Sequence, residues 1–267
     1  MGFYGIILFS LLFLALGSFS SVLIYRLPLI ENNRSLNLIS PRSHCINCKN
    51  KISFINLLPI LGFLLQRGIC EHCGKKINLS YLIHEINHVI AGLIFLYLHS
   101  ISYELLFSYF LFFVLYVMIM TDYEEFYLPF SFNICITAVG FISIYFTDLF
   151  YIKDYGVIAS SQLMLSFYGF FIGFFLLWFI NILYKLIKKK DGIGGGDILL
   201  LGGFGSIVGP LSLPSIILMG SLFTIFISFL DKDKFKEELP LGSGLILGFF
   251  LFQIFKFFEL LPQWLVI

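Results

Sequence analysis

Apolar runs of membrane-spanning length recur along this chain and limit the folds open to it more than any other feature. Of the 267 residues, 59% are hydrophobic and 12% are charged, whereas a soluble domain carries roughly 25% charged residues. A helix needs about 20 apolar residues to cross a bilayer. The sequence therefore predicts an all-α, polytopic membrane protein with about eight transmembrane helices. The eight runs are Phe3–Tyr25, Ile86–His99, Glu104–Met120, Leu128–Leu149, Ala159–Tyr184, Ile198–Val208, Leu211–Leu230 and Leu241–Leu261.

The lysines and arginines indicate how these helices are oriented. The first run has no basic segment before it and is too long for the core of a signal peptide, so we expect a retained helix. Fifteen of the 17 basic residues share one side if Arg26–Tyr81, Lys185–Lys190 and Asp231–Glu238 are cytoplasmic. The positive-inside rule then predicts that both termini lie outside the cytoplasm. Only Lys153 and Lys256 fall toward the outer face.

The long loop after the first run carries two Cys-x-x-Cys pairs. Cys45 and Cys48 form the first pair and Cys70 and Cys73 form the second, with 21 residues between the pairs. Each pair offers two thiolates at a spacing that a tetrahedral zinc ion accepts. Disulfides are a poorer explanation in a reducing cytoplasm. The spacing predicts a structural zinc site in this cytoplasmic loop, with redox-active or unligated thiols as the alternative.

Two prolines indicate breaks near this loop. Pro28 follows the interfacial residues Tyr25 and Arg26, and we expect it to end the first helix. Pro59 interrupts the apolar segment Ile52–Leu65, which is too short to span a bilayer. That segment is therefore expected to be interfacial or packed against the membrane.

The sequence His84-Glu85-Ile86-Asn87-His88 matches the H-E-x-x-H motif of zinc peptidases. The motif places two histidines one helical turn apart, with a glutamate that activates water. An intramembrane metalloprotease is therefore one alternative for this chain. It requires a third metal ligand, and none is obvious nearby. The plain alternative is that two interfacial histidines cap the entry of the second helix into the membrane.

Two aspartates stand where apolar helices meet the cytoplasmic side. Asp197 closes the glycine-rich stretch Gly192–Asp197 and precedes an apolar run. The glycines would let a substrate backbone approach closely, and the plain alternative is that Asp197 N-caps the next helix. Asp122 directly follows the third apolar run, which favours a position at bilayer depth, while Glu124 and Glu125 are expected to face solvent. Ionisable groups at such positions indicate function.

Taken together, these motifs resemble the type IV prepilin peptidases, membrane aspartic proteases of the Gly-x-Gly-Asp group. The resemblance covers nearly the whole chain, and the motifs occur in the family's order. They are Gly17-Ser18-Phe19, Tyr25-Arg26-Leu27-Pro28, both Cys-x-x-Cys pairs, Arg67-Gly68, Tyr81, Glu85, Asp122 six residues before Leu128-Pro129, Gly194-Gly195-Gly196-Asp197, and Leu239-Pro240-x-Gly242.

The resemblance implies that Asp122 and Asp197 are the catalytic pair. It further implies cleavage of a short basic leader after a glycine, in pilin-like precursors, at the cytoplasmic face of a bacterial cell membrane. Many members then N-methylate the new terminal residue with S-adenosylmethionine. Residues 1–90 would form a methyltransferase-associated part and residues 91–267 the peptidase core. The net charge of +1 gives no sign of a nucleic-acid partner.

The chain departs from the family pattern at five positions. Phe130 stands where an aspartate often follows Leu-Pro, and Leu199 replaces a common lysine. Asn56 replaces an aspartate ahead of a proline. Leu241 and Ser243 alter the usual Pro-Phe-Gly-Pro turn. None of these changes removes the aspartate pair, but they bear on substrate fit and on methyl transfer.

A non-enzymatic multispan transporter or assembly component is the remaining alternative. Such a protein would use Asp122 and Asp197 as ion or proton ligands and the cysteine loop as a docking module. A transporter is expected to place such acids near the middle of the membrane. Asp122 and Asp197 are instead expected at the ends of helices, so their position distinguishes the peptidase from the transporter.

Overall fold

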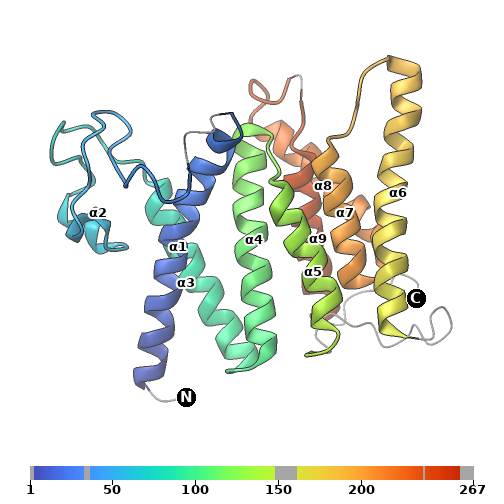
Figure 1. Ribbon diagram of the computed structural model, residues 1–267, viewed down its shortest axis with the longest axis horizontal. Helices are drawn as coiled ribbons and strands as arrows, with labels where there is room; N and C mark the ends of the chain where they lie inside the picture. The colour runs from blue at the N-terminus through green and yellow to red at the C-terminus, as the bar shows by residue number, and fades with distance from the viewer. Residues whose placement is uncertain (1–2, 33–36, 148–160, 237, 259–267) are drawn as a thin grey trace. The chain divides into compact units, whose positions relative to one another are not determined.

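The computed structural model describes residues 3–32, 37–147, 161–236 and 238–258. The described part is helical, as predicted, and its only β-structure is a pair of isolated bridges in the cysteine loop. The elements are α1 (Phe3–Asn32), η1 (Ile55–Leu57), α2 (Leu61–Leu65), α3 (Ser80–His99), α4 (Tyr103–Glu125), α5 (Phe130–Ser143), α6 (Gln162–Lys188), α7 (Gly195–Val208), η3 (Pro210–Ser212), α8 (Leu213–Leu230) and α9 (Leu241–Phe257) (Figure 1).

Each of the eight predicted runs overlaps one apolar helix. Among the described residues, five helices are long and apolar enough to cross a membrane, namely α1, α3, α4, α6 and α8 with its preceding turn. The three shorter apolar helices are α5, α7 and α9. The outer ends of the runs Leu128–Leu149, Ala159–Tyr184 and Leu241–Leu261 lie outside the described residues, as does Lys153.

The prediction that Pro28 ends the first helix is wrong, because α1 continues through Pro28 to Asn32. Proline removes one backbone hydrogen bond from a helix, and here the neighbouring loop adds contacts on the same turn. The guanidinium of Arg26 donates to the carbonyls of Asn37 at 3.0 Å, Leu38 at 3.0 Å and Pro41 at 2.5 Å. Those bonds fasten the end of α1 to the loop that follows.

The chain divides into two compact units, an N-terminal unit (Met1–Phe113) and a C-terminal unit (Val114–Ile267), with α4 crossing the boundary. In the N-terminal unit α1 packs on α3. Gly17 of α1 allows this approach, because a Cβ there would lie 2.8 Å from the Cα of Glu85 and 3.0 Å from the Cβ of His88. Nearby, the Phe13 ring covers Gly92. The two helices thus meet through glycines on both sides.

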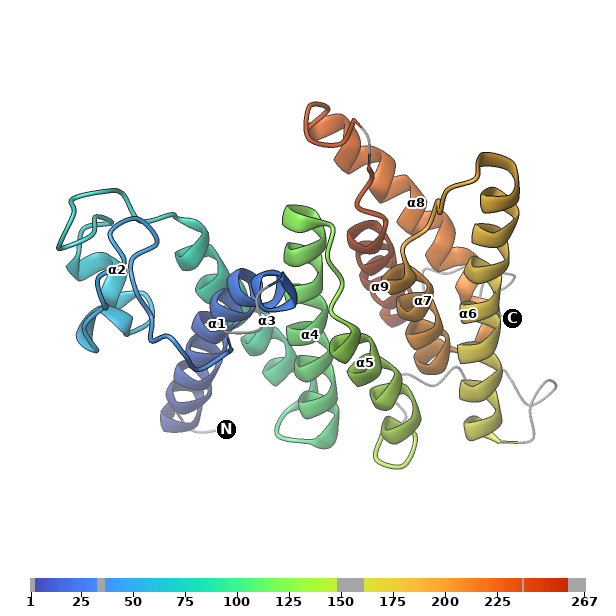
Figure 2. The same ribbon diagram turned by 45° about the horizontal axis from the view of Figure 1, so that its top comes forward.

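In the C-terminal unit α7 lies between α5 and α6 (Figure 2). Gly169 of α6 and Gly205 of α7 bring the two backbones together, since a Cβ on either would meet the other's carbonyl. Small residues are favoured at such crossings because lipid supplies no hydrophobic drive for helix association. On another face of α7, the ring of Phe204 stacks on Phe249 of α9 with centroids 4.4 Å apart.

One end of the C-terminal unit gathers the segments that matter for function. The last turns of α4, α6 and α8 and the first turns of α5, α7 and α9 lie there (Figure 1). Asp122 is in the last turn of α4, and Asp197 is the third residue of α7. The alternation of helix directions therefore brings two distant segments of the sequence to the same end of the unit.

Candidate active site and metal centre

Asp122 is held by the first turn of α9. The residue is 5% exposed. Its Oδ2 accepts two hydrogen bonds from Ser243, one from the backbone N–H at 2.5 Å and one from the hydroxyl at 2.7 Å. The prediction that Glu124 and Glu125 face solvent is confirmed, since both are exposed. The last turn of α4 therefore presents one buried acid and two exposed ones.

Asp197 is not the N-cap of α7, so the plain interpretation of this residue is wrong. The N-cap is Gly194, without a side-chain bond, and Asp197 lies two residues inside the helix. The glycine loop before it is fixed by Asn181, whose Oδ1 accepts the N–H groups of Gly192 and Ile193 at 2.9 and 3.0 Å. Asp197 is buried at 9% exposure, and its Oδ1 has no hydrogen-bond partner.

Consecutive residues of α9 join the two acids. A Cβ on Gly242 would lie 3.0 Å from Oδ1 of Asp197, and the next residue, Ser243, binds Asp122. A negative charge on Asp122 therefore disfavours one on Asp197. Leu128 closes the same site, because a Cβ on Gly196 or Gly242 would clash with its side chain. Two acids predicted from separate motifs thus lie together in a buried site with little room to spare.

The contact of Ser243 with Asp122 is the part of this site that sequence reasoning missed. The two residues are 121 positions apart, so no local pattern connects them. The available signal was that a serine stands where the family pattern has a proline. A serine in the first turn of a helix carries a free N–H and a hydroxyl, which together suit an anionic partner.

The two Cys-x-x-Cys pairs fold into the same turn twice. In the first, the N–H of Cys45 donates to the carbonyl of Asn50 at 2.9 Å; in the second, the N–H of Cys70 donates to the carbonyl of Lys75 at 2.8 Å. Each turn contains one residue with a positive φ, which is 59° at Lys49 in the first turn and 66° at Gly74 in the second. The repetition orients each pair of thiols toward one point.

The four thiols gather as a metal site requires. The Sγ atoms of Cys45, Cys48, Cys70 and Cys73 all lie within 4.8 Å of one another, and Cys45 and Cys73 are 3.9 Å apart. Four thiolates about 2.3 Å from a zinc ion fit this spacing. The backbone N–H of Lys75 lowers the pKa of the Cys73 thiol to about 6, which favours the thiolate that metals bind.

The H-E-x-x-H residues are not gathered into a metal site. Among the described residues, the four cysteines form the one group of three or more potential ligands that converges. Instead of capping an interface, His84 and His88 are buried. The ring of His88 packs edge-on against Phe112 and Phe113, with centroids 5.4 and 5.6 Å apart. These histidines therefore belong to the packing of α3 in the N-terminal unit.

Glu85 has a different role in the same motif. Its Oε2 accepts the N–H of Ile60 at 2.6 Å. Ile60 has a φ of 60°, which is unfavourable for a β-branched residue. The buried carboxylate therefore holds a strained turn of the cysteine loop against α3, and explains this glutamate without a metal.

A cavity of about 490 Å³ lies between the end of α1, the cysteine loop and the start of α3. Small-molecule sites occupy about 300–1,000 Å³ and combine apolar walls with a few polar groups. The polar residues that line the cavity include Arg26, Asn47, Asn56, Lys75 and Glu85. The cavity is thus large enough for a nucleotide-sized cofactor.

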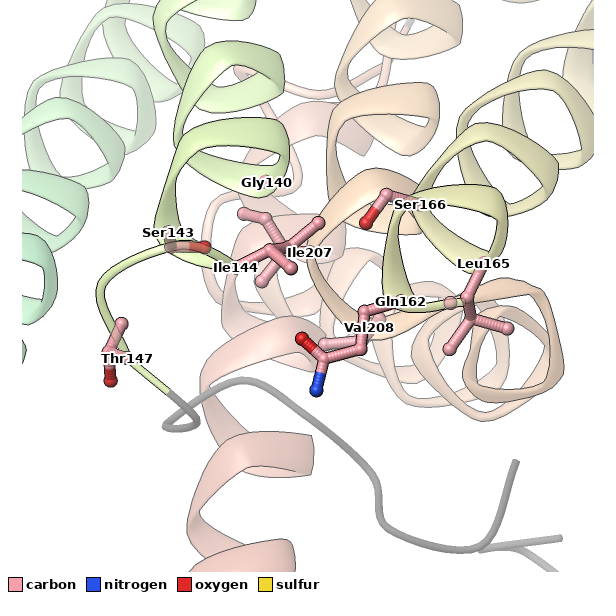
Figure 3. A pocket seen from close by; sticks show the side chains of 10 residues that line it. Gly140, Ser143, Ile144, Thr147, Gln162, Leu165, Ser166, Ile207 and Val208 are labelled. Carbon is pink, nitrogen blue, oxygen red and sulfur yellow. The ribbon is translucent and has the colours of Figure 1, made fainter. Parts of the chain in front are cut away.

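A second cavity is too small for a peptide or a cofactor. It lies between α5, α6 and α7, where Figure 3 shows Ser143, Gln162 and Val208 around it. Its volume is about 20 Å³, room for about one water molecule. Val208 lies about 16 Å along α7 from Asp197 at the rise of an α-helix, so this cavity is separate from the acids.

Comparison with protein families assigns both halves of the chain. Residues 11–100 match a family described as the bacterial peptidase A24 N-terminal domain, and residues 109–229 match the type IV leader peptidase family. No solved structure matches the chain.

The chain is also similar to curated proteins along most of its length. It is 33% identical to a prepilin leader peptidase/N-methyltransferase of Vibrio cholerae, over 93% of this chain and 96% of that protein. Proteins of the same description from Pseudomonas putida and Neisseria gonorrhoeae are 26% and 27% identical. Those two alignments cover 92% and 91% of this chain and 88% and 87% of the relatives.

Proposed function

Because the chain belongs to the type IV leader peptidase family, we propose that it is a multi-pass membrane aspartic endopeptidase that removes the short leader of type IV pilin-like precursors and then N-methylates the new N-terminus. The observation that carries this proposal is the convergence of Asp122 and Asp197 in one buried site, joined by consecutive residues of α9. Family membership supplies the substrate class, and the two carboxylates supply the hydrolytic chemistry.

Two adjacent buried carboxyl groups do not both ionise easily, so the pair holds one proton. The ionised carboxylate takes a proton from water, and the protonated one donates its proton to the scissile carbonyl. Water therefore adds directly to the peptide carbon, without an acyl-enzyme. Leu128 and the turn at Gly242 exclude bulk water from the acids, which strengthens these interactions.

The proposed topology places this site at the cytoplasmic face. All eight apolar helices would cross the membrane, leaving both termini outside the cytoplasm. The basic segment Lys185–Lys190 and the segment Asp231–Lys236 adjoin the end of the C-terminal unit that carries the acids, and the positive-inside rule makes that end cytoplasmic. A membrane-anchored precursor with a cytoplasmic leader would reach Asp122 and Asp197 there. Acids at helix ends fit a transporter less well.

We further propose that the four cysteines hold a structural zinc ion. The support is the convergence of their four sulfur atoms, all within 4.8 Å of one another, from two turns of the same form. A bound ion would clamp the two turns together and fix the cysteine loop beside α3. It would shape one wall of the 490 Å³ cavity, because Cys45 and Cys70 both line it.

Methyl transfer is assigned to residues 1–90 and hydrolysis to residues 91–267. S-Adenosylmethionine, when bound, supplies the methyl group. The cavity fits a molecule of that size, and Arg26, Asn56 and Glu85 are polar residues that would hold it or the substrate amine. The amine must lose a proton before it can accept a methyl group, and the buried Glu85 carboxylate can hold that proton.

The proposed function is tested with purified full-length protein and a model precursor. The precursor has a short lysine-rich leader, a glycine at the cleavage point, and a phenylalanine that begins an apolar segment. Mass spectrometry should show cleavage after the glycine and, with S-adenosylmethionine present, a product heavier by one methyl group. An intact precursor would contradict the peptidase, and an unmethylated product would restrict the chain to proteolysis.

The variant Glu85→Gln separates the two activities. Glutamine retains an acceptor for the Ile60 N–H but cannot hold the amine's proton. Methylation should fall about 100-fold, which is typical of the loss of a general base, while cleavage continues. Methylation at the normal rate would place methyl transfer elsewhere.

A further inference from the structure

The two acids of the site differ in the hydrogen bonds they receive. Oδ2 of Asp122 receives both the N–H and the hydroxyl of Ser243, at 2.5 and 2.7 Å. Asp197 interacts with a single backbone N–H, that of Gly194. Its Oδ1 is buried without a partner. Donors stabilise a carboxylate, whereas burial without a donor destabilises it. The pair is therefore electrostatically unequal.

The N–H of Ser243 is available because it lies in the first turn of α9. The first backbone bond of that helix joins Gly244 to Pro240 at 3.2 Å, so the preceding N–H groups have no partner within the helix. The helix thus directs a free donor at Asp122 from its positive end. The dipole of α7 also favours a charge on Asp197, but that effect is smaller than two charge-assisted hydrogen bonds.

The hydroxyl of Ser243 can donate its proton to either of two acceptors. Its Oγ lies 2.7 Å from Oδ2 of Asp122 and 3.1 Å from the carbonyl of Ile119, and it carries one proton. It donates to Asp122 while that acid is ionised, and can turn to Ile119 when Asp122 takes up a proton. The contact therefore adapts to both protonation states, whereas the N–H always points at the acid.

We propose that Ser243 is a positioning residue that keeps Asp122 ionised as the base of the peptidase reaction and leaves the shared proton on Asp197. This inference rests on the proposed function. In the first step the water oxygen bonds to the peptide carbon, its proton passes to Asp122, and the proton of Asp197 passes to the carbonyl oxygen. In the second step the C–N bond breaks, Asp122 returns its proton to the amine, and one hydroxyl of the diol returns a proton to Asp197.

Few other charges bear on Asp122. From α7 the ionisable group facing it is Asp197. On its own helix Glu124 and Glu125 are exposed. Lys234, in the segment before α9, faces Glu124 and the ring of Tyr123, 4.5 Å from its centroid. The contact that distinguishes Asp122 from Asp197 is therefore the one with Ser243.

The family's usual Pro-Phe-Gly-Pro turn would place proline at this position, without an N–H or a hydroxyl. We therefore expect removal of the Ser243 donors to shift the pH dependence of cleavage rather than abolish it. Activity is lost at low pH when the base becomes protonated, so a base that loses donors is protonated at higher pH. The acidic limb of the kcat/KM profile should then move upward, by about one to two pH units per hydrogen bond lost.

The experiment measures kcat/KM against pH for the model precursor, with full-length wild type and three variants. Ser243→Ala removes the hydroxyl, Ser243→Pro removes both donors, and Ser243→Thr keeps both. The acidic limb should move up by about one to two pH units in the alanine variant, further in the proline variant, and not in the threonine variant. Ser206→Ala, which removes a buried hydroxyl in α7 about two and a half turns after Asp197, is the control and should leave the profile unchanged.

An acidic limb that coincides with wild type in Ser243→Ala overturns the proposal, as does a shift confined to the basic limb. If the proline variant does not fold, as judged by its thermal unfolding, the alanine and threonine variants decide. Failure of the proposed function gives a different result: wild type would leave the precursor intact, or Asp122→Asn would still cleave it.

Discussion

Replacing Gly205 with alanine tests how closely α6 and α7 approach in the unit that carries the acids. The added Cβ would meet the backbone carbonyl of Gly169 far inside van der Waals contact. A backbone atom cannot rotate away as a side chain can, so the two helices must move apart. The same clash occurs from the other side in Gly169→Ala.

The expected loss of stability in Gly205→Ala is the difference between the cost of the clash and the gain from a better helix-forming residue. Overpacking of a close contact costs about 1–3 kcal/mol, and the upper part of that range applies because the obstacle is backbone. Alanine within a helix gains about 1 kcal/mol over glycine. The net destabilisation of Gly205→Ala should be about 1–2 kcal/mol, or about 2–8 °C in Tm for a chain of this size.

The assay is thermal unfolding of the purified protein in detergent, with Gly195→Ala as the matched control. Gly195 lies in the same helix, but a Cβ there would have nothing within 4 Å. Its Tm should stay unchanged or rise slightly. Equal Tm values for the two variants would refute the close backbone contact between α6 and α7.

Three further predictions concern the zinc site, the histidine motif and the core of the C-terminal unit. Purified wild type should hold one zinc ion per chain. The variant Cys73→Ser should release the ion, and the control Cys135→Ser in α5 should retain it. Metal analysis that finds no zinc in reduced wild type would contradict the proposed zinc site. His84→Ala should lower the Tm yet retain cleavage, because the acids lie in the other unit; loss of cleavage together with a bound metal would restore the metalloprotease interpretation. Phe204→Ala removes a ring stacked on α9 and should cost about 3–5 kcal/mol in unfolding free energy, whereas Phe226→Ala, 59% exposed, should change little; equal losses would contradict that packing.

Features with a local cause could be predicted from the sequence. Apolar runs have to form helices wherever they cross a membrane, and each run overlaps a helix. The two residues between paired cysteines set a turn that directs both thiols to one point, and the four cysteines do converge. Asp122 could be placed at a helix end because an apolar run stops there.

Features that depend on distant contacts could not be predicted. Proline on its own predicts the end of a helix at Pro28. In the structure α1 continues past it, and Arg26 in the same part of the helix bonds to the loop that follows. His84 and His88 read as interfacial, because nothing local shows that Gly17 of another helix packs onto them. In the sequence Ser243 is only a departure from the family motif, because its contact with Asp122 depends on how α9 lies against α4.

The central claim is that Asp122 and Asp197 act as one catalytic pair, and the most direct test is the cleavage rate of Asp122→Asn, Asp197→Asn and the double variant. Each single variant should insert and fold like wild type but cleave the precursor at least about 10²- to 10⁴-fold more slowly. The double variant should be no slower than either single one, because residues that act as a unit are not additive. The exposed neighbour variant Glu124→Gln should cleave normally. Substantial turnover by either single variant would contradict the pair.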